Sequence, residues 1–279
     1  MDTELVRTFL EIVSTGSFSH AASRLNVAQT TVSARMKTLE EKLGETLLYR
    51  RKTRIELTPA GEKFLQGAPA FIQSGERLKR LMSVPAGNSA QLTMGGEVNL
   101  PESYLGRWAW RFRRDHPEIA VQIIRDRSEL LAEQVSCGAL DLAVMHLPPM
   151  LAGTKREAIF EDTLVMVAAD PALKSVEDPR FVYVDWGEQF NQDFRLHFGD
   201  LRKAAVEFDA GPVALQYVLS SNGAAYGRLR TAQRFLDAGK LHLVPNMPRF
   251  SYPMYAVYSH DSDQALIKDA LECLRLEVS

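Results

Sequence analysis

The 279-residue sequence predicts a mixed α/β protein that begins with a winged helix-turn-helix. Three observations lead to this fold class. The first is a series of three helical segments joined by tight turns, with a short segment in the middle. The second is a basic hairpin pattern directly after them. The third is an alternation of strand and helix patterns from residue 92 onward, which is typical of α/β domains with mainly parallel sheets. The expected strands cover 92–98, 120–124, 140–145, 164–169, 181–184, 206–208, 241–244 and 254–258, and the expected helices cover 103–116, 128–138, 213–221, 228–238 and 262–276.

The helix-turn-helix prediction rests on local start and stop signals. Apolar residues over 3–15 have helical spacing, and Ser19 is a suitable N-cap for a short second helix that ends at Asn26. The third helix covers 29–43, and Gly44 supplies a common C-terminal stop. We therefore predict a winged helix-turn-helix over residues 1–58.

The outward face of the third helix carries small, polar and basic side chains, which suit contacts with base edges and phosphates. Its acidic residues come only at the C-terminal end. The predicted DNA-contacting residues of this helix are Gln29, Thr30, Thr31, Ser33, Ala34, Arg35 and Lys37. An ordinary solvated face is the alternative, although such a face is usually richer in glutamate.

The hairpin pattern over 46–58 has a strongly basic tip. We predict that Arg50, Arg51, Lys52 and Arg54 contact phosphates or the minor groove; the alternative is a solvated loop. A long helix over 59–82 follows, and residues 83–91 form a hinge. The helix carries a heptad-like apolar seam that predicts dimerisation, with packing on its own domain as the alternative. The seam consists of Phe64, Ala68, Phe71, Gly75, Leu78 and Met82.

Charge is distributed unevenly along the chain. The net charge is −2, yet residues 1–82 carry 13 Lys and Arg against nine Asp and Glu, so the remainder is formally −6. This division indicates an anionic partner for the first part only. With two cysteines, no signal peptide pattern and no long apolar segment, we expect a cytoplasmic protein that does not associate with membranes.

Sequence motifs of common enzymes are missing. We find no G-x-S-x-G, Walker A or G-x-G-x-x-G pattern, and the six histidines lack metal-ligand spacing. We therefore expect no enzymatic activity, no metal and no cofactor. An α/β enzyme and a small-molecule binding module without regulatory output remain the alternatives, and the basic first part disfavours the second.

Residues 5–61 resemble the winged helix-turn-helix of LysR-type transcriptional regulators. The resemblance lies in Gly16-Ser17-Phe18, Ala21-Ala22, Gln29-Thr30-Thr31-Val32-Ser33, Leu43-Gly44 and Leu57-Thr58-Pro59-Ala60-Gly61, with Leu48 where phenylalanine is usual. Later stretches are similar to the effector domain of that family. They include Leu92-Thr93-Met94-Gly95, His116-Pro117 and Leu140-Asp141-Leu142-Ala143.

This resemblance implies two α/β lobes of the type II periplasmic-binding-protein kind. The first lobe would be 92–162 plus 261–279, and the second 163–260. A small-molecule effector would bind between them, near strand ends and helix N-termini that favour anions. The implied effector residues are Val98, Asn99, Leu100, Ser128, Asp185, Trp186, Ser221, Asn222 and Gly223.

The resemblance leaves the roles of three residues open and implies several binding partners for the protein. Arg125 and Arg127 would either attract a carboxylate or be surface arginines, and Trp186 would be either pocket wall or core. The implied partners are double-stranded promoter DNA, an effector of unknown identity, and further copies of the chain in a dimer or homotetramer. RNA polymerase is a further candidate partner.

Overall fold

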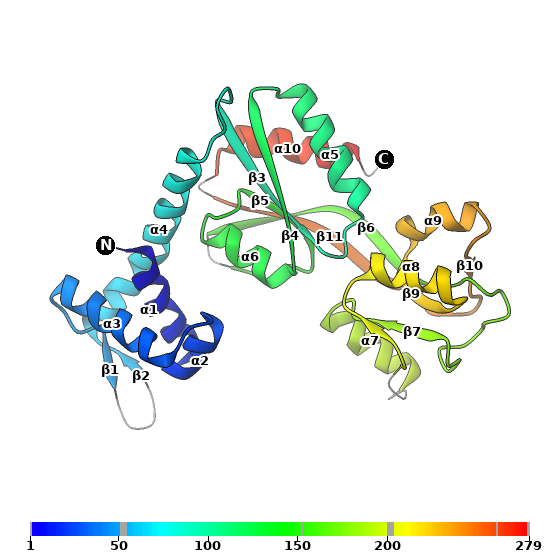
Figure 1. The fold of residues 1–279 in the computed structure, drawn as a ribbon, viewed down its shortest axis with the longest axis horizontal. Coiled ribbons are helices and arrows are strands. Elements are labelled where there is room, and N and C mark those ends of the chain that lie inside the picture. Colours follow the sequence, from blue (N-terminus) through cyan, green and yellow to red (C-terminus); the bar gives the residue numbers. More distant parts are fainter. Residues whose placement is uncertain (1, 51–54, 152, 200–203, 261, 278–279) are drawn as a thin grey trace. The chain divides into compact units, whose positions relative to one another are not determined.

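The computed structural model describes residues 2–50, 55–151, 153–199, 204–260 and 262–277 (Figure 1). The chain forms two compact units. The first unit contains Met1–Val84 with Cys137–Ala139, and the second contains Pro85–Ser136 and Leu140–Ser279. In the described part of the chain, no helix combines the length and the apolar character needed to cross a membrane.

The first unit is a winged helix-turn-helix followed by a long helix, as the sequence predicts. Its elements are α1 (Thr3–Thr15), α2 (Phe18–Arg24), α3 (Gln29–Leu43), β1 (Leu48–Arg50), β2 (Ile55–Leu57) and α4 (Pro59–Met82). The predicted N-cap of α2 at Ser19 is wrong, because the Ser17 hydroxyl accepts the hydrogen bond from the His20 amide. Asn26 has φ 52° between α2 and α3, a left-handed conformation that asparagine tolerates well.

The first part of the apolar seam of α4 packs against the DNA-binding domain that precedes it in the chain. The ring of Phe64 lies 5.1 Å from that of Phe9 in α1. Ala68 of the seam is buried, as is Ile72, which is next to the seam residue Phe71. Leu78 and Met82, near the C-terminal end, are exposed. The first part of the seam therefore packs on its own domain, which was the alternative to dimerisation. Dimerisation through the exposed C-terminal end of α4 stays a prediction.

The second unit alternates strands and helices. Its strands are β3 (Ala90–Glu97), β4 (Ile119–Asp126), β5 (Leu142–His146), β6 (Thr154–Ala168), β7 (Phe181–Val184), β8 (Glu207–Phe208), β9 (Ala224–Arg228), β10 (His242–Leu243) and β11 (Phe250–Ser259). Its helices are α5 (Glu102–Asp115), α6 (Ser128–Ser136), α7 (Glu188–Phe198), α8 (Gly211–Ser221), α9 (Leu229–Asp237) and α10 (Gln264–Leu276). The C-terminal helix α10 packs on α5 of the first lobe, where the Trp108 indole donates to the Ala270 carbonyl at 3.1 Å.

Among the described residues of this unit, the strands join in one sheet, in the order β4-β3-β5-β11-β6-β9-β7-β8, with β10 beside β6. Pairing is parallel within each lobe, for β3 with β4 and β5 and for β7 with β8 and β9. The expectation of a mainly parallel sheet is wrong at the centre, because the long strands β6 and β11 run antiparallel across both lobes. β11 pairs with β5 over Met254–Tyr258, on the side of the sheet that belongs to the first lobe.

Two elements of the second lobe are missing from the sequence prediction. α7 buries Phe190 and Phe194, whose spacing of four residues is a helical signal. No strand is predicted over β9, although every residue of Ala224–Arg228 is buried. α7 also carries Glu188, Gln189 and Gln192, which line a cavity between the two lobes of this unit.

Candidate functional site

The face of α3 that points away from the core is free of carboxylates over most of its length. Val32, Met36 and Leu39 are fully buried, which turns the opposite face outward. On that face Gln29, Thr30, Ala34 and Lys37 are exposed, and Thr31, Ser33 and Arg35 are half-buried. Small and polar side chains of this kind allow close approach of a helix to base edges.

Two ion pairs engage the basic residues of this face. Arg35 lies 3.2 Å from the carboxylate of Glu4 in α1, and Lys37 lies 3.6 Å from that of Glu41 one turn later. The exposed Lys37–Glu41 pair contributes roughly 0–1 kcal/mol, so a DNA phosphate can replace Glu41 at small cost.

Glu40, the first acidic residue of α3, is turned toward the wing. Its Oε1 accepts hydrogen bonds from the backbone amides of Leu47 at 2.8 Å and Leu48 at 3.3 Å. The wing is an antiparallel hairpin in which Leu48 pairs with Leu57 and Arg50 with Ile55. Glu40 thus anchors the wing to the helix through these two amides. The predicted tip residues Arg51, Lys52 and Arg54 lie outside the described residues.

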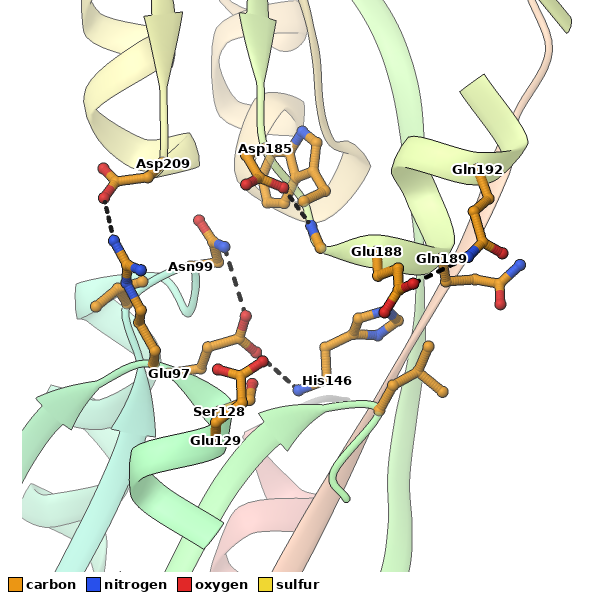
Figure 2. A pocket seen from close by; sticks show the side chains of 15 residues that line it. Glu97, Asn99, Ser128, Glu129, His146, Asp185, Glu188, Gln189, Gln192 and Asp209 are labelled. Atoms are coloured by element: carbon orange, nitrogen blue, oxygen red, sulfur yellow. Dashed lines mark hydrogen bonds and ion pairs between the residues drawn. The ribbon is translucent and has the colours of Figure 1, made fainter. Parts of the chain in front are cut away.

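A cavity of about 500 Å³ lies between the two lobes of the second unit (Figure 2). It is found where β3, β5 and β7 end and where α6 and α7 begin, the usual ligand position in open α/β sheets. Its lining residues are Glu97, Val98, Asn99, Arg127, Ser128, Glu129, His146, Leu147, Asp185, Trp186, Gly187, Glu188, Gln189, Gln192 and Asp209.

Glu97 is a buried acid in the wall of this cavity. It is 6% exposed, and its Oε2 accepts the His146 amide at 2.7 Å. Its Oε1 accepts the Tyr252 hydroxyl at 3.1 Å and the Asn99 amide at 3.4 Å. Burial raises the pKa of the Glu97 carboxyl, because the charged form loses its hydration.

His146 lies beside Glu97 as a neutral imidazole. Its ring stacks on Tyr252 with centroids 3.7 Å apart, and Nδ1 lies 2.8 Å from the Pro253 carbonyl oxygen. Because a carbonyl only accepts, Nδ1 carries the proton and Nε2 is an acceptor. Burial lowers the pKa of His146 to about 4, so the ring is uncharged at neutral pH.

Hydrogen bonds join the two lobes beside the cavity. The Asn99 Oδ1 accepts the Gly211 amide at the start of α8 at 2.8 Å. Behind it, Arg228 pairs with Asp162 at 2.9 Å, with both side chains about 1% exposed, and Arg228 donates to the Asn99 carbonyl at 3.0 Å. These contacts hold the inner end of the cavity in a defined geometry.

Two protein-family profiles match this chain and together span nearly all of it. Residues 3–62 match the bacterial regulatory helix-turn-helix protein, lysR family, and residues 85–278 match the LysR substrate binding domain. The chain belongs to the LysR family of transcriptional regulators. The resemblance inferred from the sequence is therefore confirmed.

Individual relatives align with this LysR regulator along its whole length. The transcriptional regulator HdfR of Escherichia coli O17:K52:H18 is 28% identical over 276 residues, covering 98% of this chain and 97% of HdfR. A full-length OxyR structure from Pseudomonas aeruginosa has a TM-score of 0.58 at 19% identity, covering 99% and 98% of the two chains. LysG from Corynebacterium glutamicum, solved with bound effector Arg, has a TM-score of 0.53 at 18% identity and 98% coverage of each chain. The two structures share the fold.

The cavity brings together some of the effector residues predicted for this LysR regulator and leaves others out. Val98, Asn99, Ser128, Asp185 and Trp186 line it. Leu100 is fully buried in the core. Trp186 is both core and wall, since it is 3% exposed and its Nε1 donates to the Tyr226 carbonyl at 3.0 Å.

The segment Ser221-Asn222-Gly223 lies at the opposite end of the strands. It immediately precedes β9, whose first residue Ala224 pairs with Phe181 at the start of the parallel strand β7. The cavity lies beyond the far end of β7, at Asp185. The helix α8 begins beside Trp186 and runs back to Ser221, which explains why these residues are not part of the cavity.

The sequence prediction did not include several lining residues. Glu97 and His146 stand at the ends of buried strands, and this position is the signal that could have identified them. Glu188, Gln189 and Gln192 come from α7, which was not predicted. Among the described residues no cluster of His, Cys, Asp and Glu is suited to hold a metal ion.

Proposed function

We propose that this LysR regulator binds promoter DNA by placing α3 in the major groove and the wing on the adjacent backbone or minor groove. The observation that carries this proposal is the outward face of α3, which has no carboxylate before Glu40, while Glu40 itself is hydrogen-bonded to the wing. Such a face gives bases and phosphates polar and basic partners without repulsion.

Dimerisation through α4 would present two recognition helices to two half-sites. The exposed apolar residues Leu78 and Met82 near the end of α4 support this role. Half-sites would then lie one helical turn of DNA, or a multiple of it, apart. Effector domains would join two dimers into a homotetramer on DNA in the cytoplasm, with RNA polymerase as a further partner.

The cavity between the lobes would hold a small-molecule effector. Its position at strand ends and the match of residues 85–278 to a substrate binding domain support this assignment, as does the effector Arg bound to the relative LysG. Effector binding would change the closure of the lobes and thereby the affinity for DNA, as a coupling free energy between two sites.

A gel-shift titration with the DNA upstream of the gene for this protein tests the proposal. Ser33→Ala on α3 should weaken specific binding about tenfold while non-specific binding changes less. Ser74→Ala on α4, where the hydroxyl bonds the Ala70 carbonyl, is the matched control and should bind as the wild type does. Absence of specific, salt-sensitive binding to that DNA and to neighbouring promoters would refute the proposal.

A further inference from the structure

One backbone amide at the start of α7 and one at the start of α8 already have oxygen partners within the chain. The Gly211 amide at the start of α8 is bonded by Asn99, and the Gly187 amide at the start of α7 by Asp185 at 3.0 Å. The first turns of α6 and α7 also carry Glu129 and Glu188. These two amides are therefore occupied, and the two carboxylates reduce the attraction of α6 and α7 for an anion.

The two arginines near the cavity are also engaged. Arg127 lies 3.0 Å from the Asp209 carboxylate across the interlobe space. Arg125 does not line the cavity, and its guanidinium donates to the carbonyls of Val98 and Leu100. Arg125 therefore lies outside the cavity lining, and Arg127 already has a carboxylate partner on the opposite wall.

Carboxylates occur on both walls of the cavity (Figure 2). The lining has five acidic residues, Glu97, Glu129, Asp185, Glu188 and Asp209, against the single guanidinium of Arg127, a formal charge of −4. Three helix N-termini would offset roughly 1.5 charges at about half a charge each. The cavity stays negative even when Glu97 is protonated.

Glu97 is the buried member of this set and receives only uncharged donors: a peptide amide, a phenol and a side-chain amide. Among the described residues no cationic side chain forms an ion pair with it, and Arg228 is paired with Asp162. The three donors leave part of the acceptor capacity of Glu97 unused. The charge of Arg228 offsets only part of the cost of burying Glu97, because desolvation is the larger effect on its pKa. A buried carboxylate without a direct ion pair is unfavourable, and a cation entering the cavity would supply a direct counter-charge.

We propose that the interlobe cavity of this regulator binds a small organic cation whose primary ammonium or guanidinium group is received by Glu97. The inference rests on the proposed function, because it takes this cavity as the effector site. Glu188 and Asp185 add negative charge from the opposite wall, and Trp186 and Leu147 provide apolar contact for the ligand body. An organic cation fits better than a metal ion, since the carboxylates come from separate elements and form no metal-binding cluster in the described chain.

Thermal unfolding of the full-length protein tests this assignment. All three tryptophans, Trp108, Trp110 and Trp186, lie in the effector domain, so their fluorescence reports on it directly. The cationic probes are putrescine, agmatine, L-lysine and L-arginine, and the anionic probes are succinate and citrate, all at millimolar concentration. We expect at least one cation to raise the midpoint by about 2–4 °C and neither anion to do so.

Calorimetric titration of variants then locates the binding. Glu97→Gln should weaken the active cation at least about tenfold. Glu188→Gln, at an exposed position, should also weaken it, and it serves if Glu97→Gln does not fold. Glu272→Gln on α10, where the carboxylate lies 4.0 Å from Lys268 on the exposed surface, is the matched control and should bind as the wild type does.

Four outcomes overturn the proposal: no cation binds, an anion binds in preference, both pocket variants bind as tightly as the wild type, or Glu272→Gln loses binding equally. The gel shift with wild-type protein separates failure of this proposal from failure of the proposed function. If the wild-type protein binds DNA specifically and any of these outcomes is observed, only the proposal of a cationic effector is refuted, and the proposed function as a DNA-binding regulator stands.

Discussion

Acidification should destabilise the effector domain through His146. In the folded protein its pKa lies at about 4 instead of the ordinary 6.5, because the ring is buried against Tyr252 and stays neutral. Between these two pH values the unfolded chain binds a proton that the folded chain does not bind. The stabilisation by neutral His146 is therefore complete above pH 6.5 and is lost as the pH falls toward 4.

The size of this effect follows from the two pKa values. One pKa unit corresponds to about 1.36 kcal/mol, so the difference between 6.5 and about 4 corresponds to about 3 kcal/mol. Glu97 acts in the opposite sense, because its pKa is raised and its contribution decreases as the pH rises. Comparison of the wild type with a variant that retains Glu97 separates the two groups.

The variant is His146→Asn, whose amide can replace Nδ1 as the donor to the Pro253 carbonyl. Urea unfolding followed by tryptophan fluorescence at several values between pH 7 and pH 4.5 gives the free energy of unfolding of both proteins. The wild type should lose about 2–3 kcal/mol more than the variant over this range. NMR titration of the histidine ring protons should place the His146 midpoint near 4. Parallel pH profiles for the two proteins, or a midpoint near 6.5, would refute the reasoning.

Two further predictions concern buried contacts. Asp162→Asn leaves the Arg228 guanidinium buried without its ion-pair partner, so urea unfolding should show a free energy of unfolding about 3–5 kcal/mol lower than that of the wild type. The control Glu161→Gln, at an exposed neighbouring position, should change this free energy by less than about 0.5 kcal/mol. Equal effects of the two variants would mean that the buried pair does not stabilise the fold. A Cβ at Gly61 in α4 would lie 2.1 Å from the Leu47 carbonyl oxygen, while one at Gly67 in the same helix would meet nothing within 4 Å. Calorimetry should therefore show that Gly61→Ala destabilises the DNA-binding domain by about 1–3 kcal/mol and that Gly67→Ala stabilises it by about 0.5–1 kcal/mol. A Gly61→Ala protein as stable as the wild type would contradict the close approach of α4 to the wing.

The DNA-binding domain could be predicted from the sequence because the signals that define its helices are local. The bounds of α3 agree with the prediction, since apolar spacing and Gly44 define a helix from neighbours in the chain. The outward position of Lys37 and Ala34 then follows from helical geometry alone. The N-cap of α2 was misplaced because both Ser17 and Ser19 are suitable caps, and only the backbone geometry selects Ser17.

Only some of the residues that line the effector cavity could be predicted from the sequence. Asn99 and Asp185 could be inferred because they follow strands that the sequence predicts. Ser221 could not be placed correctly without knowing that α8 begins beside Trp186 and runs back to the start of β7 at Phe181. Glu188 was missed together with its helix α7.

By itself, the sequence determined the family, the winged helix-turn-helix, the alternation of strands and helices and the basic character of the first part. The tertiary structure decided the antiparallel crossing of β6 and β11, the part of α4 that packs on its own domain, and the acidic character of the cavity. The reason is physical: periodicity and capping depend on residues within a few positions of each other. The charge of a cavity depends on residues such as Glu97, Glu188 and Asp209, which meet only after distant strands have paired.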